Sequence, residues 1–325
     1  MEFITTLKEY LLTVHPVRKT ARQKEEFRAW LMGELKRDRW SPREEHYGKF
    51  NGSVNVIAGD PDRATVFLCA HYDTPSRMLL PDFVSPTNVV AHMGYHLLAA
   101  LGLVAAAFVL SFAVSFPLNK PGLMLPLFLV LMVGLLWLSA FGPANRENAN
   151  GNSSGVLALL AVARSLPRDK RVCLLFLDNN SRNLLGAAAF KRKHPNAAAS
   201  ALFINFDCVG DGEELLVMPS KHSRWDGELL SALTSAFRPE EGVQPYVLSQ
   251  GLQYYPSDHR KFKFHVAVCA CRKGMLGYTI PHLRTRRDTT LREENIRYIT
   301  GAVERFLPQY FGGEQEIWRG AGNSH

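Results

Sequence analysis

The residues best suited to chemistry stand where apolar segments of the chain end. The segment ATVFLCAHYD ends with His71 and Asp73, and the segment ALFINFD ends with Asp207. His71 and Asp73 flank a single residue, so on an extended chain their side chains point to the same side. Because the carboxyl ends of parallel strands meet at one edge of a sheet, imidazole and carboxylate groups there predict a metal site.

Polar groups recur in two later segments, PSDHRKF and HLRTRRDTT. They are Ser257, Asp258, His259, His282, Arg284 and Asp288. Each of these features is weak by itself. A His-x-Asp pair also suits a structural ion pair, and Asp207 could equally cap a turn.

The order of the polar segments is more specific than any one of them. After the His-x-Asp segment come NANGNSSGV, LDNNSRNLLGA, NFDCVG, SDHRKF and RTRRDTT. This succession resembles the co-catalytic di-zinc aminopeptidase family of peptidase clan MH, over essentially the whole chain outside one apolar stretch. The segment HYDTPSRMLLPDF is similar to a bacterial, membrane-anchored branch of that family, in which a two-span hairpin follows this segment.

The resemblance implies a particular metal chemistry, in which two zinc ions about 3.5 Å apart activate a water molecule. On the matching positions, His71 and Asp207 would be ligands of the first zinc, and Asp73 would orient His71. The other family positions are replaced. The bridging Asp, the general base, the Glu ligand and the final His ligand fall on Gly151, Asn180, Ser181 and Arg284.

These replacements predict the loss of the catalytic machinery. Gly151 offers no side chain, and the permanent positive charge of Arg284 repels a metal ion. The amide of Asn180 cannot accept and return a proton near neutral pH. We therefore expect a non-catalytic relative of a zinc peptidase, without a zinc cofactor, that binds or regulates a peptide or protein partner in the old cleft.

An active hydrolase with a single zinc ion is the alternative. It would retain His71 and Asp207 as ligands and would need a substitute third ligand, for which His282 is the candidate. Asp178 and Asp258 are the carboxylates near enough in sequence to the polar segments to act as its base.

Without zinc, the carboxylates of Asp73 and Asp207 would repel each other in a partly dry site. We therefore expect the guanidinium of Arg284 to replace the lost cation by pairing with one of them. This pairing would preserve the fold without a metal.

Two long uncharged segments predict a transmembrane hairpin. From Phe83 to Asn119 there is no Asp, Glu, Lys or Arg, and a second uncharged segment ends at Phe141. Each contains about 20 apolar residues, enough to span a bilayer. The lipid bilayer is thus an expected partner. The alternatives are two buried helices of a soluble protein, or a transport subunit, for which the spans lack intramembrane charges.

The flanking segments are expected on the same, cytoplasmic side of the membrane. The loop between the spans carries only Lys120, whereas Arg77 and Arg146 lie outside them. No signal peptide is recognisable at the N-terminus. The cysteine number is odd, and most cysteines lie in apolar segments, which indicates reduced thiols. They are Cys69, Cys173, Cys208, Cys269 and Cys271.

Apolar strand-like segments alternate with amphipathic helical ones. This pattern predicts an α/β fold with a mostly parallel central sheet flanked by helices, interrupted by the hairpin. We expect residues 1–82 and 144–325 to form one peptidase-like domain around an insertion at 83–143. The net charge of +8 favours anionic partners such as lipid headgroups. No nucleic-acid-binding motif is present, so no nucleic acid partner is expected.

Overall fold

The computed structural model describes residues 2–48, 52–78 and 80–312. The strands are β1 (Pro42–Tyr47), β2 (Ser53–Ala58), β3 (Val66–His71), β4 (Val172–Leu177), β5 (Leu202–Phe206), β6 (Glu214–Pro219), β7 (Gln244–Val247), β8 (Phe264–Gly274) and β9 (Gly277–Thr279). The helices are α1 (Glu2–Thr13), α2 (Ala21–Arg37), α3 (Val89–Ser115), α4 (Met124–Phe141), α5 (Ser154–Ser165), α6 (Leu185–Lys193), α7 (Pro195–Ser200), α8 (Gly227–Ala236) and α9 (Glu293–Tyr310).

Within the described residues, nine strands form one sheet in the order β1-β2-β4-β3-β5-β8-β6-β7, with β9 paired to β8. At the centre, β4, β3, β5 and β8 run parallel. Antiparallel pairing of β2 with β4 and of β6 with β8 extends the sheet on both sides. The predicted α/β fold is confirmed, with a sheet that is parallel at its centre and mixed overall.

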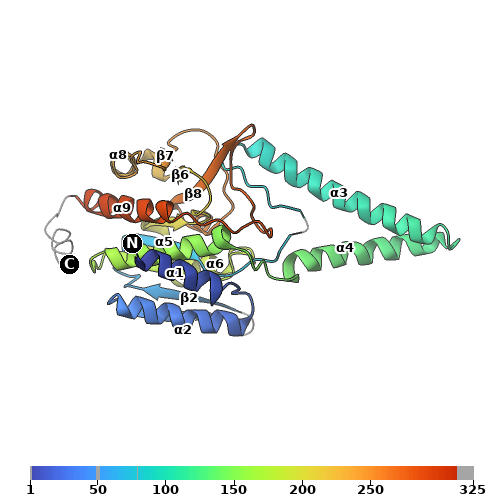
Figure 1. The fold of residues 1–325 in the computed structure, drawn as a ribbon, viewed down its shortest axis with the longest axis horizontal. Helices are drawn as coiled ribbons and strands as arrows, with labels where there is room; N and C mark the ends of the chain where they lie inside the picture. The colour runs from blue at the N-terminus through green and yellow to red at the C-terminus, as the bar shows by residue number, and fades with distance from the viewer. Residues whose placement is uncertain (1, 49–51, 79, 313–325) are drawn as a thin grey trace.

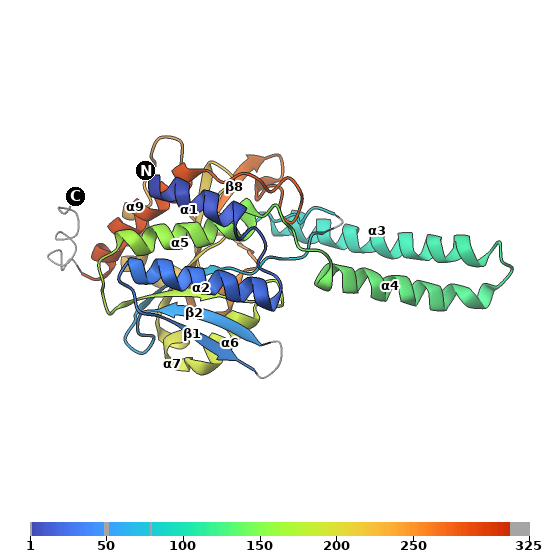
Figure 2. The same cartoon turned by 60° about the horizontal axis from the view of Figure 1, so that its bottom comes forward.

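The central strands are buried on both faces over most of their length, which explains why they are mostly apolar. In β3, Val66, Leu68 and Ala70 pack into the core beneath α1, α2, α5, α8 and α9. The alternating residues Phe67 and Cys69 pack into a second core beneath α6 and α7. Figures 1 and 2 show the sheet between these helices.

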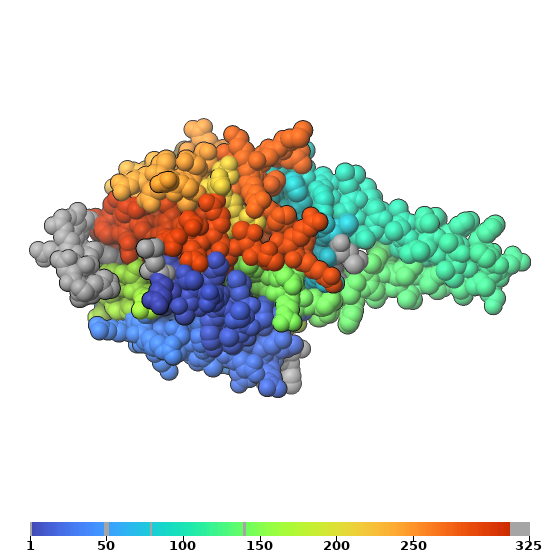
Figure 3. Space-filling model, viewed as in Figure 1, coloured from blue at the N-terminus to red at the C-terminus, as the bar shows by residue number. Residues whose placement is uncertain are grey.

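The helices α3 and α4 leave the body side by side as a long hairpin (Figures 1 and 2), and the space-filling view shows them projecting away from it (Figure 3). Their most apolar windows have mean hydropathies of 2.6 and 2.2, and only 11% and 0% of the residues in those windows are buried. Both helices are long and apolar enough to cross a membrane. Their exposure contradicts the alternative of two helices buried in a soluble core.

The hairpin is closed at its base and leaves the sheet intact. The strands before and after it, β3 and β4, are parallel neighbours. Ser76 and Ala144 form an isolated β-bridge. The backbone N–H of Arg77 also donates to the carbonyl of Pro143 at 2.9 Å. The chain therefore enters and leaves the hairpin at one point beside the carboxyl ends of the central strands.

The first turn of α5 lies directly against the end of β5. A Cβ atom at Gly155 would lie 2.3 Å from the carbonyl oxygen of Phe206, whereas one at Gly33 in α2 would meet nothing within 4 Å. We expect Gly155→Ala to lower the free energy of unfolding by about 1–3 kcal/mol, because the backbone must shift. Gly33→Ala should leave it unchanged or raise it by up to about 1 kcal/mol. Denaturation in detergent, followed by circular dichroism, compares the two, and equal losses would contradict this packing.

Candidate functional site

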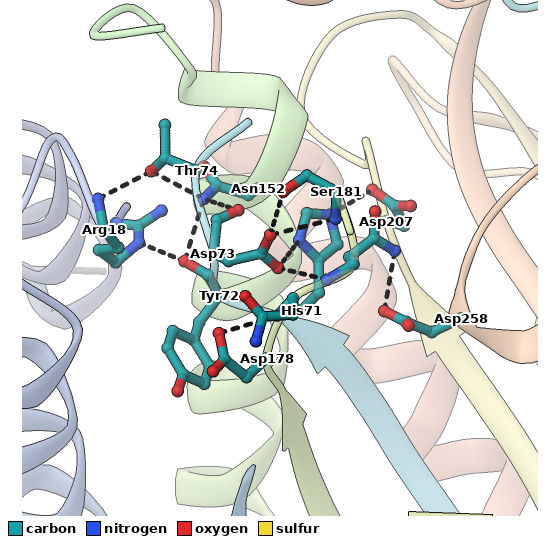
Figure 4. A network of polar contacts seen from close by, with 12 residues as sticks. Arg18, His71, Tyr72, Asp73, Thr74, Asn152, Asp178, Ser181, Asp207 and Asp258 are labelled. Carbon is teal, nitrogen blue, oxygen red and sulfur yellow. Dashed lines mark hydrogen bonds and ion pairs between the residues drawn. The ribbon is translucent and has the colours of Figure 1, made fainter. Parts of the chain in front are cut away.

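The ends of β3 and β5 bring the candidate residues together. These strands are parallel neighbours with Cys69 opposite Asn205, so His71 at the end of β3 and Asp207 just after β5 lie at the same edge of the sheet. Figure 4 shows His71, Asp73 and Asp207 within one network of polar side chains.

His71 lies between two carboxylates. Its Nδ1 is 3.4 Å from Oδ1 of Asp73, and its Nε2 is 3.4 Å from Oδ1 of Asp207. All three side chains are buried. Burial by itself lowers the pKa of His71, but Asp207 and Asp73 outweigh this effect and raise the pKa well above its usual value. The two carboxylates thus favour the protonated, positively charged form of the imidazole.

The same cation keeps both carboxyl groups ionised. Burial raises the pKa of Asp73 and of Asp207, but the contacts with His71 and further hydrogen bonds hold both pKa values below the usual range. Ser257 Oγ donates to Asp207 Oδ2 at 2.5 Å, and Cys208 Sγ lies 3.2 Å from Oδ1.

The turn after β4 supplies the hydrogen bonds that Asp73 accepts. Asn179 and Asn183 adopt the left-handed conformation (φ 54° and 59°), which asparagine tolerates better than most residues. The backbone N–H groups of Asn180 and Ser181 donate to Asp73 at 2.8 and 3.1 Å, and the Ser181 hydroxyl donates at 2.7 Å. Ser181, which stands where the resemblance places the Glu ligand, is thus hydrogen-bonded to the carboxylate of Asp73.

Asn180, which stands where the resemblance places the general base, also acts as a hydrogen-bond donor. Asn180 Nδ2 donates to Oδ2 of Asp258 at 2.9 Å. Burial raises the pKa of Asp258 to about 7, although the positive charge of His71 and this hydrogen bond oppose it. Asp178, the second candidate base, is engaged instead by Lys24, whose Nζ lies 2.6 Å from Oδ1.

Arg284 does not pair with either buried carboxylate, so the expectation that it replaces the lost cation is wrong. Its Nε lies 3.4 Å from Oδ2 of Asp82, and the side chain remains partly exposed. The buried position between Asp73 and Asp207 is taken by His71, whereas Arg284 stays hydrated at the rim. This arrangement avoids the cost of burying a guanidinium.

Gly151 lies in a helical turn at residues 149–153 and faces Asp288. Oδ1 of Asp288 accepts the N–H of Asn150 at 2.7 Å, and Oδ2 accepts the N–H of Gly151 at 3.1 Å. A Cβ atom at Gly151 would be 3.0 Å from Oδ2 of Asp288. Burial raises the pKa of Asp288 to about 7. An aspartate at position 151 would therefore direct its carboxyl group toward the carboxyl group of Asp288.

Arg18 supports this edge of the sheet and was missed in the sequence, because nothing near it predicts burial. It is fully buried, and burial lowers its pKa to about 9 although Asp73 opposes this. Its Nε donates to the carbonyl of Tyr72 at 2.7 Å, and its backbone N–H donates to Oγ1 of Thr74 at 2.9 Å (Figure 4). Arg18 thereby fixes the segment that carries His71.

The cavity at this site is small, with a volume of about 80 Å³. His71, Asp207, Gly151, Ser181 and Arg284 all contribute to its wall. A volume of about 80 Å³ holds two or three water molecules. His282 is not among the described residues that line this cavity, so the structure does not bring the proposed substitute ligand to it.

The donors present do not fit a two-metal centre. Within residues 2–48, 52–78 and 80–312, no three His, Cys, Asp or Glu side chains are grouped so that they could hold a metal ion. His71 is shared between two carboxylates, Ser181 donates to Asp73, and Gly151 has no donor atom.

The fold is that of zinc aminopeptidases and glutaminyl cyclases. It is similar to the glutaminyl cyclase of Porphyromonas gingivalis, with a TM-score of 0.59 and 16% identity over 95% of this chain and 96% of that chain. It is also similar to a Zn-dependent exopeptidase from Parabacteroides distasonis (TM-score 0.57, 16% identity, 95% and 98% covered). A leucine aminopeptidase precursor from Bacteroides thetaiotaomicron gives a TM-score of 0.57 at 13% identity, with 94% and 96% covered.

Residues 139–272 match the model of peptidase family M28. The matched segment contains Gly151, Asn180, Ser181 and Asp207. It leaves His71 outside. No curated protein sequence matches this chain.

The raised pKa of His71 predicts a specific pH dependence of stability. A pKa raised on folding contributes stability that is fully present below the unfolded value of about 6.5, and this contribution is lost as the pH rises through the folded-state pKa. At pH values below about 6.5, we expect the free energy of unfolding of the wild type to exceed that of His71→Gln by about 3 kcal/mol. The difference should shrink steadily above that pH.

Thermal unfolding in detergent, at pH values below and above about 6.5, measures this difference in stability. His46→Gln is the matched control, because His46 lies on the edge strand β1 and is largely exposed. Its small difference from wild type should change little with pH. A His71→Gln difference that did not change with pH would show that folding leaves the pKa of His71 unchanged, and a difference that fell as the pH dropped below about 6.5 would show that His71 is neutral in the folded protein.

Proposed function

We propose that this protein is a membrane-anchored, non-catalytic relative of the zinc aminopeptidases and glutaminyl cyclases, with a binding or regulatory function. One observation carries the proposal: of the positions at which the resemblance places metal ligands, only His71 and Asp207 hold groups that can bind a metal ion, whereas Gly151 has no side chain and Arg284 pairs with Asp82. Zinc bound to His71 and Asp207 would have to replace the proton on Nε2 and separate these two side chains, whereas the contact of Nδ1 with Asp73 could remain.

Two further contacts support the absence of peptidase chemistry. Asn180 and Ser181 both use their side chains as hydrogen-bond donors, to Asp258 and to Asp73. A general base must instead accept a proton from a water molecule. The small cavity at the site also leaves no room for a peptide in this conformation. A partner would therefore bind at the rim or after the surrounding loops have moved.

Membrane anchoring is supported by the exposed surface of α3 and α4. Val90, Leu98 and Val130 are among the apolar side chains that these helices leave exposed. Water would contact this surface at a high free-energy cost, whereas lipid chains would cover it. The hairpin places both of its ends at the same side, so the α/β body would lie on one side of the membrane.

Zinc content tests the absence of a metal cofactor. We expect the detergent-purified protein to hold less than about 0.1 zinc per chain after zinc loading, because His71 and Asp207 supply only two of the three ligands a catalytic zinc usually has. Mass spectrometry measures the metal, and release of aminoacyl-p-nitroanilide measures activity. His71→Ala and the exposed-site control His46→Ala should give the same low zinc content as wild type.

The contrary result is equally clear. About one zinc per chain, lost in His71→Ala and retained in His46→Ala, would establish a single-metal site. Hydrolysis that followed the zinc content would then identify an active hydrolase and overturn the proposal, with Asp258 as the carboxyl group to examine as its base.

Cysteine labelling tests the membrane arrangement. The five native cysteines are all buried and free, so a membrane-impermeant maleimide should react with them only weakly. We expect Lys120→Cys, between α3 and α4, to be labelled in intact bacterial cells, because the loop would lie outside. Lys170→Cys, exposed between α5 and β4, should be labelled only after permeabilisation. The reverse pattern would place the body outside, and recovery of the protein without detergent would refute the anchor.

A further inference from the structure

A second cavity, of about 630 Å³, lies beyond Tyr255, which lines both it and the small cavity at His71. It extends beside the end of β6 and the start of β8, two strands labelled in Figure 1. Residues 251–263 close its other side. This volume is within the range of small-molecule sites.

The wall of this cavity is strongly basic. Its lining includes no Asp or Glu, and three histidines contribute to it, His222, His259 and His265. It also contains six lysine or arginine residues: Lys191, Lys221, Arg224, Arg260, Lys261 and Lys263. Cations gathered on one wall attract anions to it, and because several of them are exposed, solvent and salt screen their mutual repulsion.

Several of these cations are held in place. Arg224 donates from Nε to the carbonyl of Pro219 at 3.0 Å and from Nη1 to the carbonyl of Gly251 at 2.9 Å. The guanidinium of Arg260 lies over the ring of Tyr254, 4.8 Å from its centre. Guanidinium groups that are positioned in this way lose little freedom when they bind an anion.

A buried histidine of the cavity wall lacks a partner. The side chain of His259 is only 5% exposed, and its Nδ1 has no hydrogen-bond partner. Its ring stacks on Tyr255 and lies 4.8 Å from the ring of His265. An unpaired buried ring nitrogen costs free energy. Because Nδ1 itself is buried, a ligand in the cavity would contact other atoms of this ring.

We propose that this cavity binds a phosphate-bearing anion. Six cations suit a ligand of more than one negative charge, and guanidinium and ammonium groups are the donors that proteins use most for phosphate oxygens. Arg224, Arg260 and the flanking lysines would contact the phosphate.

The position of the cavity defines two sources for this phosphate. Its wall residue Tyr254 donates its backbone N–H to the carbonyl of Pro86 at 2.9 Å, and its ring lies 5.0 Å from the ring of His92 in the first turn of α3. The cavity therefore adjoins the base of the hairpin. The phosphate belongs either to a soluble phosphate ester or to the headgroup of an anionic phospholipid.

Calorimetry on the full-length protein tests the proposal. Inorganic pyrophosphate is titrated into protein in neutral detergent, and the binding of phosphatidylglycerol is measured in mixed micelles against phosphatidylcholine. We expect Lys221→Ala/Lys263→Ala to weaken binding about tenfold, because two cations that line the cavity are removed. Both lysines are exposed, so the variant should fold.

A second double variant controls for total charge. Lys36→Ala/Lys170→Ala removes two exposed lysines outside the cavity and should change affinity less than about twofold. Pyrophosphate binding that follows this pattern identifies a soluble ligand, and phosphatidylglycerol binding alone identifies a headgroup. Binding of neither probe, or equal losses in both double variants, would overturn the proposal.

Discussion

The structure depends on the buried ion pairs that His71 makes with Asp73 and Asp207. The carboxyl ends of β3 and β5 bring these two carboxylates into a dry edge of the sheet, where their mutual repulsion is hardly screened. A positive charge must lie between them if both are to stay ionised. The imidazolium provides it, while Ser181 and Ser257 donate hydrogen bonds to the remaining carboxylate oxygens. Much of the network is therefore bonded within the chain, although Nδ1 of His71 lies near Asp73 without forming a hydrogen bond.

The rim of the site and the base of the hairpin are one structural unit. The bridge between Ser76 and Ala144 joins the two chain segments that run toward α3 and α4. Lys19 donates to the Ser76 hydroxyl at 2.5 Å and to the carbonyl of Gly142 at 2.6 Å, so the segment between α1 and α2 holds the same base. Arg284 at the rim pairs with Asp82, just before α3.

Elements whose side chains are buried could be predicted from the sequence, because burial requires a recognisable run of apolar residues. Elements held mainly by backbone or long-range hydrogen bonds could not. The strands β3, β4, β5 and β8 are the four parallel central ones, and each contains a buried, mostly apolar segment. Strand β1 has the sequence PREEHY and pairs through its backbone at the sheet edge, so no apolar pattern reveals it. The same limit applies to Arg18, whose burial follows from hydrogen bonds to distant segments. Backbone hydrogen bonding and long-range burial leave no local pattern in the chain.

The sequence by itself determined the central strands, the two apolar helices and the identity of the side chains at each site position, because these depend on local composition and on order along the chain. Only the tertiary structure decided which charges meet. Arg284 has the right charge to neutralise Asp207, yet it pairs with Asp82, because a left-handed backbone (φ 57°) and its place at the rim hold it away from the buried edge. His71 occupies the space between Asp73 and Asp207 instead. Pairing energies depend on distance and burial, and both are set by the folding of segments that are far apart in the sequence.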